Sequence, residues 1–358
     1  SGLVDSLFGK SEAPIKAIIE HEIEDFEQDS QFKKIFCMDT TDKYGERYLS
    51  MTSSGNFEDV GENGPYPDTS FQEGFSKFLE PSTWKKRLTI TREMMEDGNQ
   101  SAVIARARDF GLSFARTREM YAAATLIGGL NSSMKFGNKD MQMRTYDTTT
   151  GDKLSLFNKA HKSITQPKYT QSNRFSYTSS DDLYTVLDTM QEKMQKFTDD
   201  DGNLLATAPD TIIIPNSGKM KRKLTEVVGS EFKDGGNRVG FNFQYGGWNF
   251  IVWNYLPNTI AGKEYFMLMD SKKNQNTLAM PFLDRVKLTT DSYTDKNTDA
   301  QVYTGRARFI AGFVNWRSIA IAGEDLADAS VLHIASEQMR KHCSNLAFSF
   351  SAAALDKH

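Results

Sequence analysis

The sequence predicts an α+β protein in which one long helix and a mixed α/β region are linked by β-rich segments. A helical pattern of apolar residues runs to about Leu126 and is closed by Gly128-Gly129. The apolar run Thr211–Pro215 is typical of a buried strand, and a helix and further strands follow it in alternation. Residues 301–322 are again rich in β-forming residues, so the chain returns to sheet after the α/β region.

Composition places the chain among folded proteins and argues against several functional classes. Its 358 residues are enough for one large core or two modest ones, and 24 Phe with 13 Tyr are too many aromatic residues for a disordered chain. The 43 basic and 47 acidic residues give a net charge of -4, which argues against a basic face that grips nucleic acid. Cys37 and Cys343 are far apart and form no C-x-x-C motif, so neither a disulfide framework nor a zinc cage is expected.

Neither a membrane span nor a signal peptide is predicted. The longest apolar stretch, residues 120–130, is too short to cross a bilayer core of about 30 Å. Residues 1–10 lack the charged and apolar regions of a signal peptide, and the chain starts at Ser1 rather than Met. We expect either proteolytic maturation or removal of a tag to have produced that end, and we expect no membrane partner.

The first forty or so residues predict an acidic amphipathic arm. Apolar residues recur at near-helical spacing from Ile15 to Phe26, and Pro14 suits a first helical turn, so a helix is predicted over residues 14–28. Its acidic side is a solvated face in the simplest interpretation. The sharper alternative is an arm that lies on a neighbouring subunit.

Residues 44–86 predict a long β-hairpin with an irregular tip. The alternating runs Tyr48–Thr52 and Phe71–Phe75 suit two strands, and glycines and prolines gather between them in the stretch GENGPYP. A segment this long with little helical signal is unusual inside a compact domain. We therefore expect it to project and to find its packing partner elsewhere.

The helix after the hairpin is predicted to be a structural spine. A short strand at Leu88–Ile90 leads into it, and at 1.5 Å per residue the helix would be about 40 Å long. Its arginines lie mostly off the apolar stripe and have acids nearby, so ion pairs between subunits are a better use for them than DNA binding. These arginines are Arg106, Arg108, Arg116 and Arg118.

The second half of the chain alternates between helix and strand. A helix over residues 183–197 is capped by the acidic residues before it. A helix over 217–228 and short strands between 241 and 270 follow the buried strand. Residues 325–343 are predicted to be helical, and Leu346–His358 to be a small-residue tail.

No catalytic residue, cofactor or metal ligand is predicted. The chain contains no Walker loop and no G-x-G-x-x-G, G-x-S-x-G or H-E-x-x-H motif. Its five histidines are scattered, and the run Asp199–Asn203 has neither the register nor the final Glu of an EF-hand, so it predicts a turn. An unrecognised hydrolase that uses Asp199–Asp201 or His161 is the enzyme alternative.

Three stretches, in this order, resemble the HK97-like fold. LTITREMMEDGNQSAVIARARDFGLSFARTREMYAAATLI is similar to the strand-to-helix turn and spine helix of Mu-like major head subunits. APDTIIIPNSGKMKRKLTEV resembles the start of the axial (A) domain, and ARFIAGFVNWRSIAIAG resembles the peripheral-domain (P) strand that returns into it. The resemblance covers about residues 14–324 and is to the major capsid proteins of tailed bacteriophages.

The resemblance implies a chain divided into an arm, an extended hairpin called the E-loop, a P domain built on the spine helix and an α/β A domain. The implied boundaries are 1–43 for the N-terminal arm, 44–90 for the E-loop hairpin, 91–207 for the P domain with the spine helix, 208–284 for the A domain, 285–312 for the returning P-domain strands, and 313–358 for the A-domain return and C-terminal tail.

The function implied is that of a virion shell protein. Copies would assemble in the cytoplasm of a bacterial host into hexamers and pentamers of an icosahedral capsid, around double-stranded DNA contacted without sequence specificity. A portal, a scaffold, a maturation protease or a cement protein would be further partners, and an encapsulin-like compartment that encloses a cargo enzyme is the alternative. Arm and hairpin side chains should then be buried on neighbours. The candidate intersubunit contacts are Ile18, Ile19, Ile23, Phe57, Tyr66, Phe71, Phe75, Arg87, Arg106 and Arg116.

The chain departs from some relatives in one respect. Those relatives lock the shell with a bond between a hairpin lysine and an asparagine of a neighbouring subunit. Here no lysine occurs between Lys43 and Lys77, and the predicted tip Phe57–Tyr66 contains none. We therefore predict a shell without this crosslink, held by non-covalent contacts or by a separate cement protein.

Overall fold

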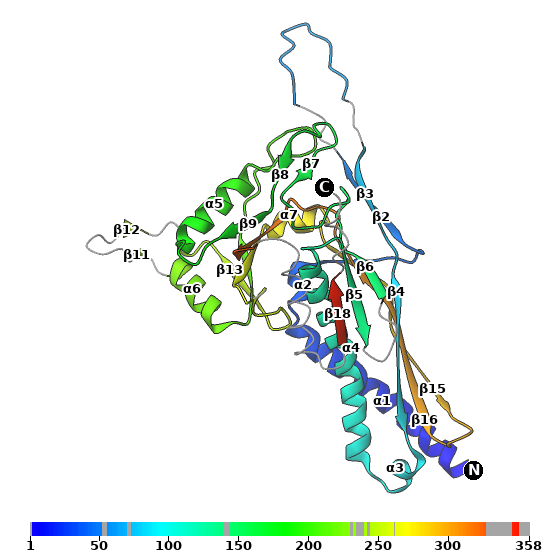
Figure 1. The fold of residues 1–358 in the computed structure, drawn as a ribbon. Helices are drawn as coiled ribbons and strands as arrows, with labels where there is room; N and C mark the ends of the chain where they lie inside the picture. Colours follow the sequence, from blue (N-terminus) through cyan, green and yellow to red (C-terminus); the bar gives the residue numbers. More distant parts are fainter. Residues whose placement is uncertain are drawn as a thin grey trace. The chain divides into compact units, whose positions relative to one another are not determined.

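Figure 1 draws the fold of the computed structural model. The chain forms two compact units, each of which is described by itself. The structure describes residues 2–51, 56–69, 73–138, 144–229, 232–233, 240–241, 244–260, 262–326 and 346–350. Unit 1 consists of Ser1–Glu46, Leu79–Ala122 and Phe282–Ala311, and unit 2 of Arg47–Phe78, Ala123–Pro281 and Gly312–His358.

Unit 1 contains a four-stranded sheet in the order β1-β15-β16-β4. The long strands β15 (Pro281–Thr294) and β16 (Gln301–Ala311) form an antiparallel hairpin whose register shifts near Val286. β4 (Ser82–Ile90) pairs antiparallel with β16, and β1 (Cys37–Thr40) lies on the other edge. The sheet is thus assembled from three distant parts of the sequence.

The predicted spine is confirmed as a helix, but a turn interrupts its start. α3 (Arg92–Glu96) is capped by Thr91, whose hydroxyl accepts a hydrogen bond from the Met94 amide. Gly98 then adopts φ +64°, a conformation that favours glycine. The long helix α4 (Gln100–Gly128) begins after it. The strand and the spine are therefore joined through a separate short helix.

The arm helix α1 (Gly2–Gln28) begins well before the predicted start. Pro14 lies inside it rather than in its first turn, which corrects the prediction; the proline ring costs one backbone hydrogen bond. A short helix, α2 (Phe32–Ile35), follows. Ile15 and Ile19, which follow Pro14, are buried in the core of unit 1, and this packing stabilises the helix despite the proline.

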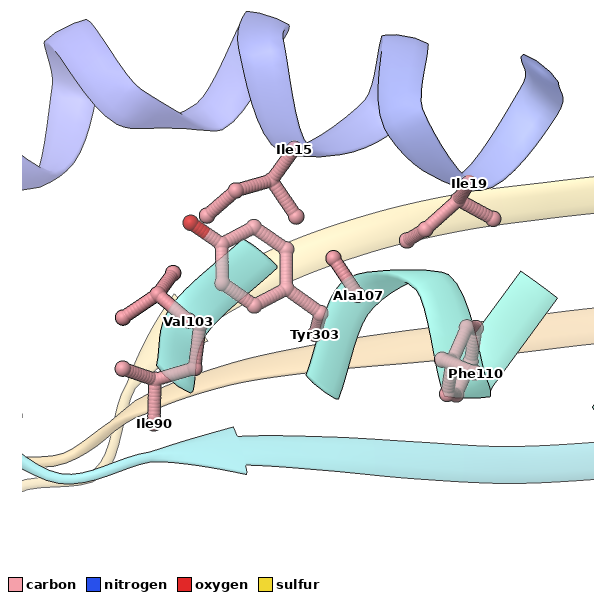
Figure 2. Packing of buried hydrophobic residues seen from close by; sticks show 7 residues of the cluster. All are labelled: Ile15, Ile19, Ile90, Val103, Ala107, Phe110 and Tyr303. Atoms are coloured by element: carbon pink, nitrogen blue, oxygen red, sulfur yellow. The ribbon is translucent and has the colours of Figure 1, made fainter. Parts of the chain in front are cut away.

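The core of unit 1 lies where α1, α4 and the sheet meet. Figure 2 shows side chains from all three directed toward one another. A Cβ atom on Gly111 of α4 would lie 2.6 Å from the Ile19 carbonyl oxygen of α1, so the two helices approach closely only because that position is glycine. The buried members of the cluster are Ile15, Ile19, Ile90, Val103, Ala107, Phe110 and Tyr303.

Unit 2 is built on a five-stranded sheet in the order β13-β10-β14-β17-β9. Every residue of two of its inner strands, β10 (Thr211–Pro215) and β14 (Tyr265–Met269), is buried, which explains their continuous apolar runs. β10 runs parallel to β13 (Asn249–Trp253), and β17 (Ile319–Glu324) runs parallel to the edge strand β9 (Arg174–Tyr177).

Helices and small sheets complete unit 2. The predicted helices are confirmed as α5 (Leu183–Gln195), which Asp182 caps, and α6 (Gly218–Val228). The remaining elements are α7 (Ser271–Asn276), the paired strands β7 (His161–Lys162) and β8 (Thr170–Gln171), the paired strands β11 (Phe232–Lys233) and β12 (Gly240–Phe241), and the strands β5 (Ser133–Asn138) and β6 (Arg144–Asp147).

The end of the chain differs from the predicted small-residue tail. β18 (Leu346–Phe350) is a strand that pairs antiparallel with β5, because β5 offers a free edge on the side opposite β6. Most of the helix predicted over 325–343 lies outside the described residues.

The predicted hairpin is present as β2 (Glu46–Met51) and β3 (Glu73–Leu79), which form a two-stranded sheet. Residues 56–69 between them contain no helix or strand and form an extended loop (Figure 1). The next strand, β4, belongs to the sheet of unit 1 and not to this hairpin. None of the helices in the described part of the chain is long and apolar enough to span a bilayer.

Candidate assembly surfaces

The loop at residues 56–69, here called the tip, exposes aromatic side chains fully. Phe57 has a relative exposure of 107% and Tyr66 of 99%, so neither contacts the rest of its own subunit to any useful extent. The tip carries the carboxylates of Glu58, Asp59 and Glu62, together with Asp68, and no basic residue. An exposed aromatic and acidic loop is unfavourable in isolation and suited to a basic partner surface with apolar pockets.

A basic groove lies in unit 1 between β4 and α4. It has a volume of about 310 Å³ and is lined by Lys86, Arg87 and Arg106, with Asp109 as the acidic residue in its wall. The Lys86 ammonium donates to the Ser113 hydroxyl at 2.8 Å, and the Arg106 guanidinium donates to the Thr89 carbonyl at 3.0 Å. We call this surface the spine groove.

The apolar residues of the arm helix pack against other parts of unit 1 and are not left exposed for a neighbouring subunit. Ile19 is 1% exposed in the cluster with Phe110, so the prediction that it packs on a neighbour is wrong for this side chain: α4 already covers it. Ile18 and Ile23 are partly buried against the same cluster. On the polar side of α1, Glu22 pairs with Arg108 at 3.4 Å.

Arg118 is also occupied inside its own unit, contrary to the predicted intersubunit pairing of the spine arginines. Its guanidinium donates two hydrogen bonds to Asp284, at 2.7 and 3.0 Å, and its side chain is 7% exposed. The guanidinium carbon lies within 4.8–5.8 Å of four ring centroids. The rings belong to Phe32, Phe114, Phe282 and Phe309.

Glu119 has a structural role that the sequence did not signal. Its carboxylate accepts hydrogen bonds from the Ser30 hydroxyl at 2.6 Å and from the amides of Gln31 and Phe32 at 2.9 and 3.2 Å. These groups form the turn between α1 and α2, so a spine carboxylate holds the arm at its end. The partners are almost ninety positions apart in sequence, at a separation of 89 for Ser30, and no local pattern links them.

The hairpin lysine Lys77 is held by an ion pair within unit 2. Its ammonium lies 2.7 Å from the Asp147 carboxylate and donates to the Thr149 hydroxyl at 3.0 Å, with 8% of the side chain exposed. Burial favours a higher pKa for Asp147, but the hydrogen bonds from Lys77 and Thr149 outweigh it, so the pKa of Asp147 is lowered. Lys77 is therefore a poor candidate for a bond to a neighbour.

The residues of the hydrolase alternative are part of the interior of unit 2. His161 is fully buried and stacks on Trp316 with ring centroids 4.3 Å apart, and its Nδ1 lies 2.6 Å from an oxygen of Asp152. Burial works to raise the pKa of Asp152, but the hydrogen bond and charge of His161 outweigh it and lower that pKa. The buried His161 and Asp152 side chains thus hold together the loop that joins them.

The acidic run near residue 200 forms a turn, as predicted. The Asp199 carboxylate accepts from the amides of Asp201 and Asn203, at 3.0 and 2.8 Å, and Gly202 adopts φ +86°. Asp200 pairs with the buried Arg317 at 3.0 Å. No group of three His, Cys, Asp or Glu side chains in the described part of the chain is placed to hold a metal ion.

The structure separates the predicted contact residues into three groups. Phe57, Tyr66, Arg87 and Arg106 are exposed. Phe75 and Arg116 are half-buried, as are Ile18 and Ile23, whereas Ile19 is in the core. Phe71 lies outside the described residues. An intersubunit role stays a prediction for the exposed and half-buried members.

A spine helix on a four-stranded sheet, a hairpin with an extended tip and a five-stranded α/β sheet together define the HK97-like class of capsid protein. Residues 74–322 match the family described as phage capsid protein. The chain belongs to that family, and it is a major capsid protein, a structural component that self-associates into the shell of the virion.

The chain is similar to several solved structures at low sequence identity. The mature capsid of bacteriophage PhiM1 is 9% identical, with 83% of this chain and 87% of that chain covered and a TM-score of 0.50. The capsid of cyanophage P-SCSP1u is 11% identical over 84% and 89% of the two chains, with a TM-score of 0.49. A virus-like particle from Pyrococcus furiosus is 11% identical over 87% and 98%, with a TM-score of 0.47. No curated protein sequence matches the chain.

Proposed function

We propose that copies of this chain form hexamers and pentamers of an icosahedral head and enclose double-stranded DNA without sequence-specific contact. The near-neutral composition, with a net charge of -4, supports a shell that does not bind the packaged nucleic acid tightly. Assembly takes place in the cytoplasm of a bacterial host. A portal and a scaffold, a maturation protease or a cement protein are its further partners.

One observation carries the proposal beyond family membership. The tip presents Phe57 and Tyr66 entirely to solvent, and burial of aromatic side chains on a partner stabilises a contact by roughly 25 cal/mol per Å² of apolar area. In a closed shell every copy is surrounded by identical copies, so each tip has a partner surface in the same relative position. In a monomeric protein these two aromatic side chains would stay exposed to water.

The proposed roles of the parts follow the family architecture. The spine helix and four-stranded sheet act as the P domain, the five-stranded sheet acts as the A domain, and the β2–β3 hairpin acts as the E-loop. The hairpin strands, in which Glu73 of β3 is exposed, lie across the spine helix of a neighbour, where Arg87, Arg106 and Arg116 offer positive charge.

The shell is proposed to be free of a hairpin-lysine crosslink. Lys77 is the only lysine between Lys43 and Lys85, and its ammonium is buried against Asp147. Moving it to a neighbour would break that ion pair and the hydrogen bond to the Thr149 hydroxyl. Non-covalent contacts or a cement protein then stabilise the shell.

We also propose that the subunit performs no catalysis. The titratable groups that invited an enzyme interpretation, His161 with Asp152 and Asp200 with Arg317, are paired in the interior. Their hydrogen bonds hold loops in place, which is a sufficient role for them.

The test is electron microscopy of the purified protein in negative stain, together with size measurement and nuclease treatment. We expect closed shells tens of nanometres wide and, in particles from infected or expressing cells, DNA that resists the nuclease. A monomer of 40.4 kDa that persists at high concentration would overturn the proposal. Shells that contain a folded enzyme and no nucleic acid would point instead to an encapsulin-like compartment.

A further inference from the structure

In addition to the spine groove of unit 1, a groove is present in unit 2. It has no role in the functions proposed above. It lies between α5 on one side and β9 with the preceding segment on the other, and its volume is about 830 Å³. The groove has an apolar floor, in which Tyr177 and Met190 are buried and Phe175 is half-buried. We call it the α5 groove. Its size falls in the range of pockets that bind ligands of several hundred daltons.

The rim of the α5 groove is basic. Lys159, Lys193 and Lys196 are exposed there, and none of them makes an ion pair with another residue that the structure describes. The two rim acids are committed to the backbone: Asp181 accepts from the Thr178 amide at 2.7 Å, and Asp182 from the Tyr184 amide at 3.1 Å. Because the three lysines outnumber the two acids, the rim keeps a net positive charge that is available to an acidic partner.

A cation–π contact links the floor of the groove to its rim. The Lys193 ammonium lies 5.3 Å from the centroid of the Phe175 ring. An acidic segment that brings an aromatic side chain would meet a cation and a ring at this point. Such a pairing combines apolar burial with charge attraction, the two features that anchor residues of interfaces share.

The backbone of β9 favours recognition through side chains over addition of a strand. β9 is an edge strand, but the Ser172 hydroxyl donates to the Arg174 carbonyl at 3.0 Å and accepts from the Arg174 amide at 3.3 Å. The carbonyl of Tyr177 already accepts from the Asp325 amide. A partner thus finds few open ladder positions and binds mainly through the floor and the rim.

We propose that the α5 groove receives the tip, residues 56–69, of a second copy of this chain. This inference rests on the proposed shell, in which hairpins reach neighbouring copies, and it adds the docking site of the tip. The tip complements the groove: it brings two fully exposed aromatic side chains to the apolar floor, and four carboxylates without a single base to the basic rim. No ion pair engages these carboxylates within the described residues.

The spine groove is the less suitable receiver for the tip itself. Its volume is about 310 Å³, against about 830 Å³ for the α5 groove.

A charge-swap series on the full-length chain tests the docking. Glu58→Lys with Asp59→Lys reverses the tip, and Lys193→Glu with Lys196→Glu reverses the groove. Each pair alone is expected to lower shell yield at least tenfold by electron microscopy, and both pairs in one chain are expected to restore it. The matched control replaces the groove pair with Lys85→Glu and Arg87→Glu on β4, which is expected to give no restoration.

A binding measurement supports the series and is independent of assembly. A fluorescent peptide of residues 56–69 is titrated into the tip-reversed full-length chain, whose own tips cannot occupy the grooves. We expect saturable binding that weakens as salt is raised and that falls at least tenfold with Lys193→Glu and Lys196→Glu. Circular dichroism on each variant checks that α5 and the rest of the chain stay folded.

Three results would overturn the docking. They are the absence of peptide binding, binding unchanged by the groove variants, and restoration of shells by the β4 control instead of the groove pair. Each leaves the shell proposal standing so long as the unaltered chain forms shells. Failure of the unaltered chain to form shells would instead remove the shell proposal, so the two failures are distinguishable.

Discussion

The arm helix α1 and the hairpin tip pose the same problem and solve it differently. Both carry large apolar side chains outside a compact fold in the predicted architecture, and both were expected to reach neighbours. In the structure α1 buries Ile15 and Ile19 to 3% and 1% exposure within unit 1, whereas the tip leaves Phe57 and Tyr66 fully exposed. An amphipathic helix can thus be covered within its own subunit, whereas an irregular loop with exposed aromatic residues cannot.

The largest expected effect comes from removing the tip. Replacement of residues 56–69 by a short Gly-Ser linker should reduce shells below detection, because no neighbour contact of the tip remains, while the subunit stays folded. Electron microscopy measures the shells and calorimetry measures the thermal midpoint, which should move by no more than a few degrees. Loss of the fold along with the shells would show that the tip is structural inside the subunit and would remove the contrast with α1.

The next effect concerns the interior pair that unit 1 uses to hold its sheet to the spine. Arg118→Met leaves the Asp284 carboxylate, 12% exposed, without its cation and should lower the free energy of unfolding by about 3–5 kcal/mol. Denaturant unfolding measures the change. The double variant with Asp284→Leu should recover most of the loss, since it removes the stranded charge; no recovery would mean that packing of the arginine against the rings dominates.

A smaller loss of folding stability is expected when a buried side chain of α1 is shortened. Ile19→Ala removes buried methyl groups from the cluster with Phe110 and should lower the free energy of unfolding by about 2–5 kcal/mol. Phe57→Ala in the tip is the matched comparison, and it should change that free energy by less than about 0.5 kcal/mol while lowering shell yield. Equal stability of the two variants would mean that the arm belongs to a neighbour after all.

The same correction changes the expected result of truncation. If the arm lay only on a neighbour, deletion of residues 1–30 would leave a folded subunit that cannot assemble. Because Ile15 and Ile19 form part of the core of unit 1, deletion should instead unfold that unit and expose the apolar face of α4. Proteolysis and circular dichroism of the truncated chain distinguish a folded subunit from an unfolded unit.

The smallest effect appears at acid pH. The folded-state pKa of Asp152 is lowered, mainly by His161 against the opposing effect of burial, so its contribution to stability is present above the unfolded pKa, near 4, and is lost as the pH falls below it. Asp152→Asn should flatten the unfolding free energy in that range. Glu58→Gln with Asp59→Asn, in the exposed tip, should leave the acid unfolding curve unchanged; a matching change there would mean that the tip contacts its own subunit.

Much of the fold was predictable because it depends on residues that are close together in the sequence. The apolar run of β10 and the acidic cap of α5 each depend on a few adjacent residues. The spine was predictable as a helix for the same reason, whereas the break at Gly98 was not, since a single turn changes the periodicity little. The family resemblance rested on these local stretches, in order.

The partners of charged and apolar side chains were not predictable. Arg118 and Asp284 are 166 positions apart, and nothing near either residue indicates the other. Periodicity showed that α1 has an apolar face but not which surface covers it, so Ile19 was assigned to a neighbour. The hairpin tip was predictable from sequence, yet the basic groove proposed to receive it is divided among β9, α5 and the loops around them, which only the folded chain brings together.

Unit 1 is discontinuous, and this has a consequence for how the protein is made. Its first segment ends at Glu46, but its last segment begins at Phe282. At about 5–20 residues per second, a ribosome needs roughly 10–50 s to synthesise the intervening chain. Throughout that interval the apolar stripe of the nascent α1 lacks the β16 tyrosine, Tyr303, that completes its native cover. The beginning of this chain therefore depends on its distant end, and the early nascent polypeptide is a substrate suited to a chaperone that shields amphipathic helices.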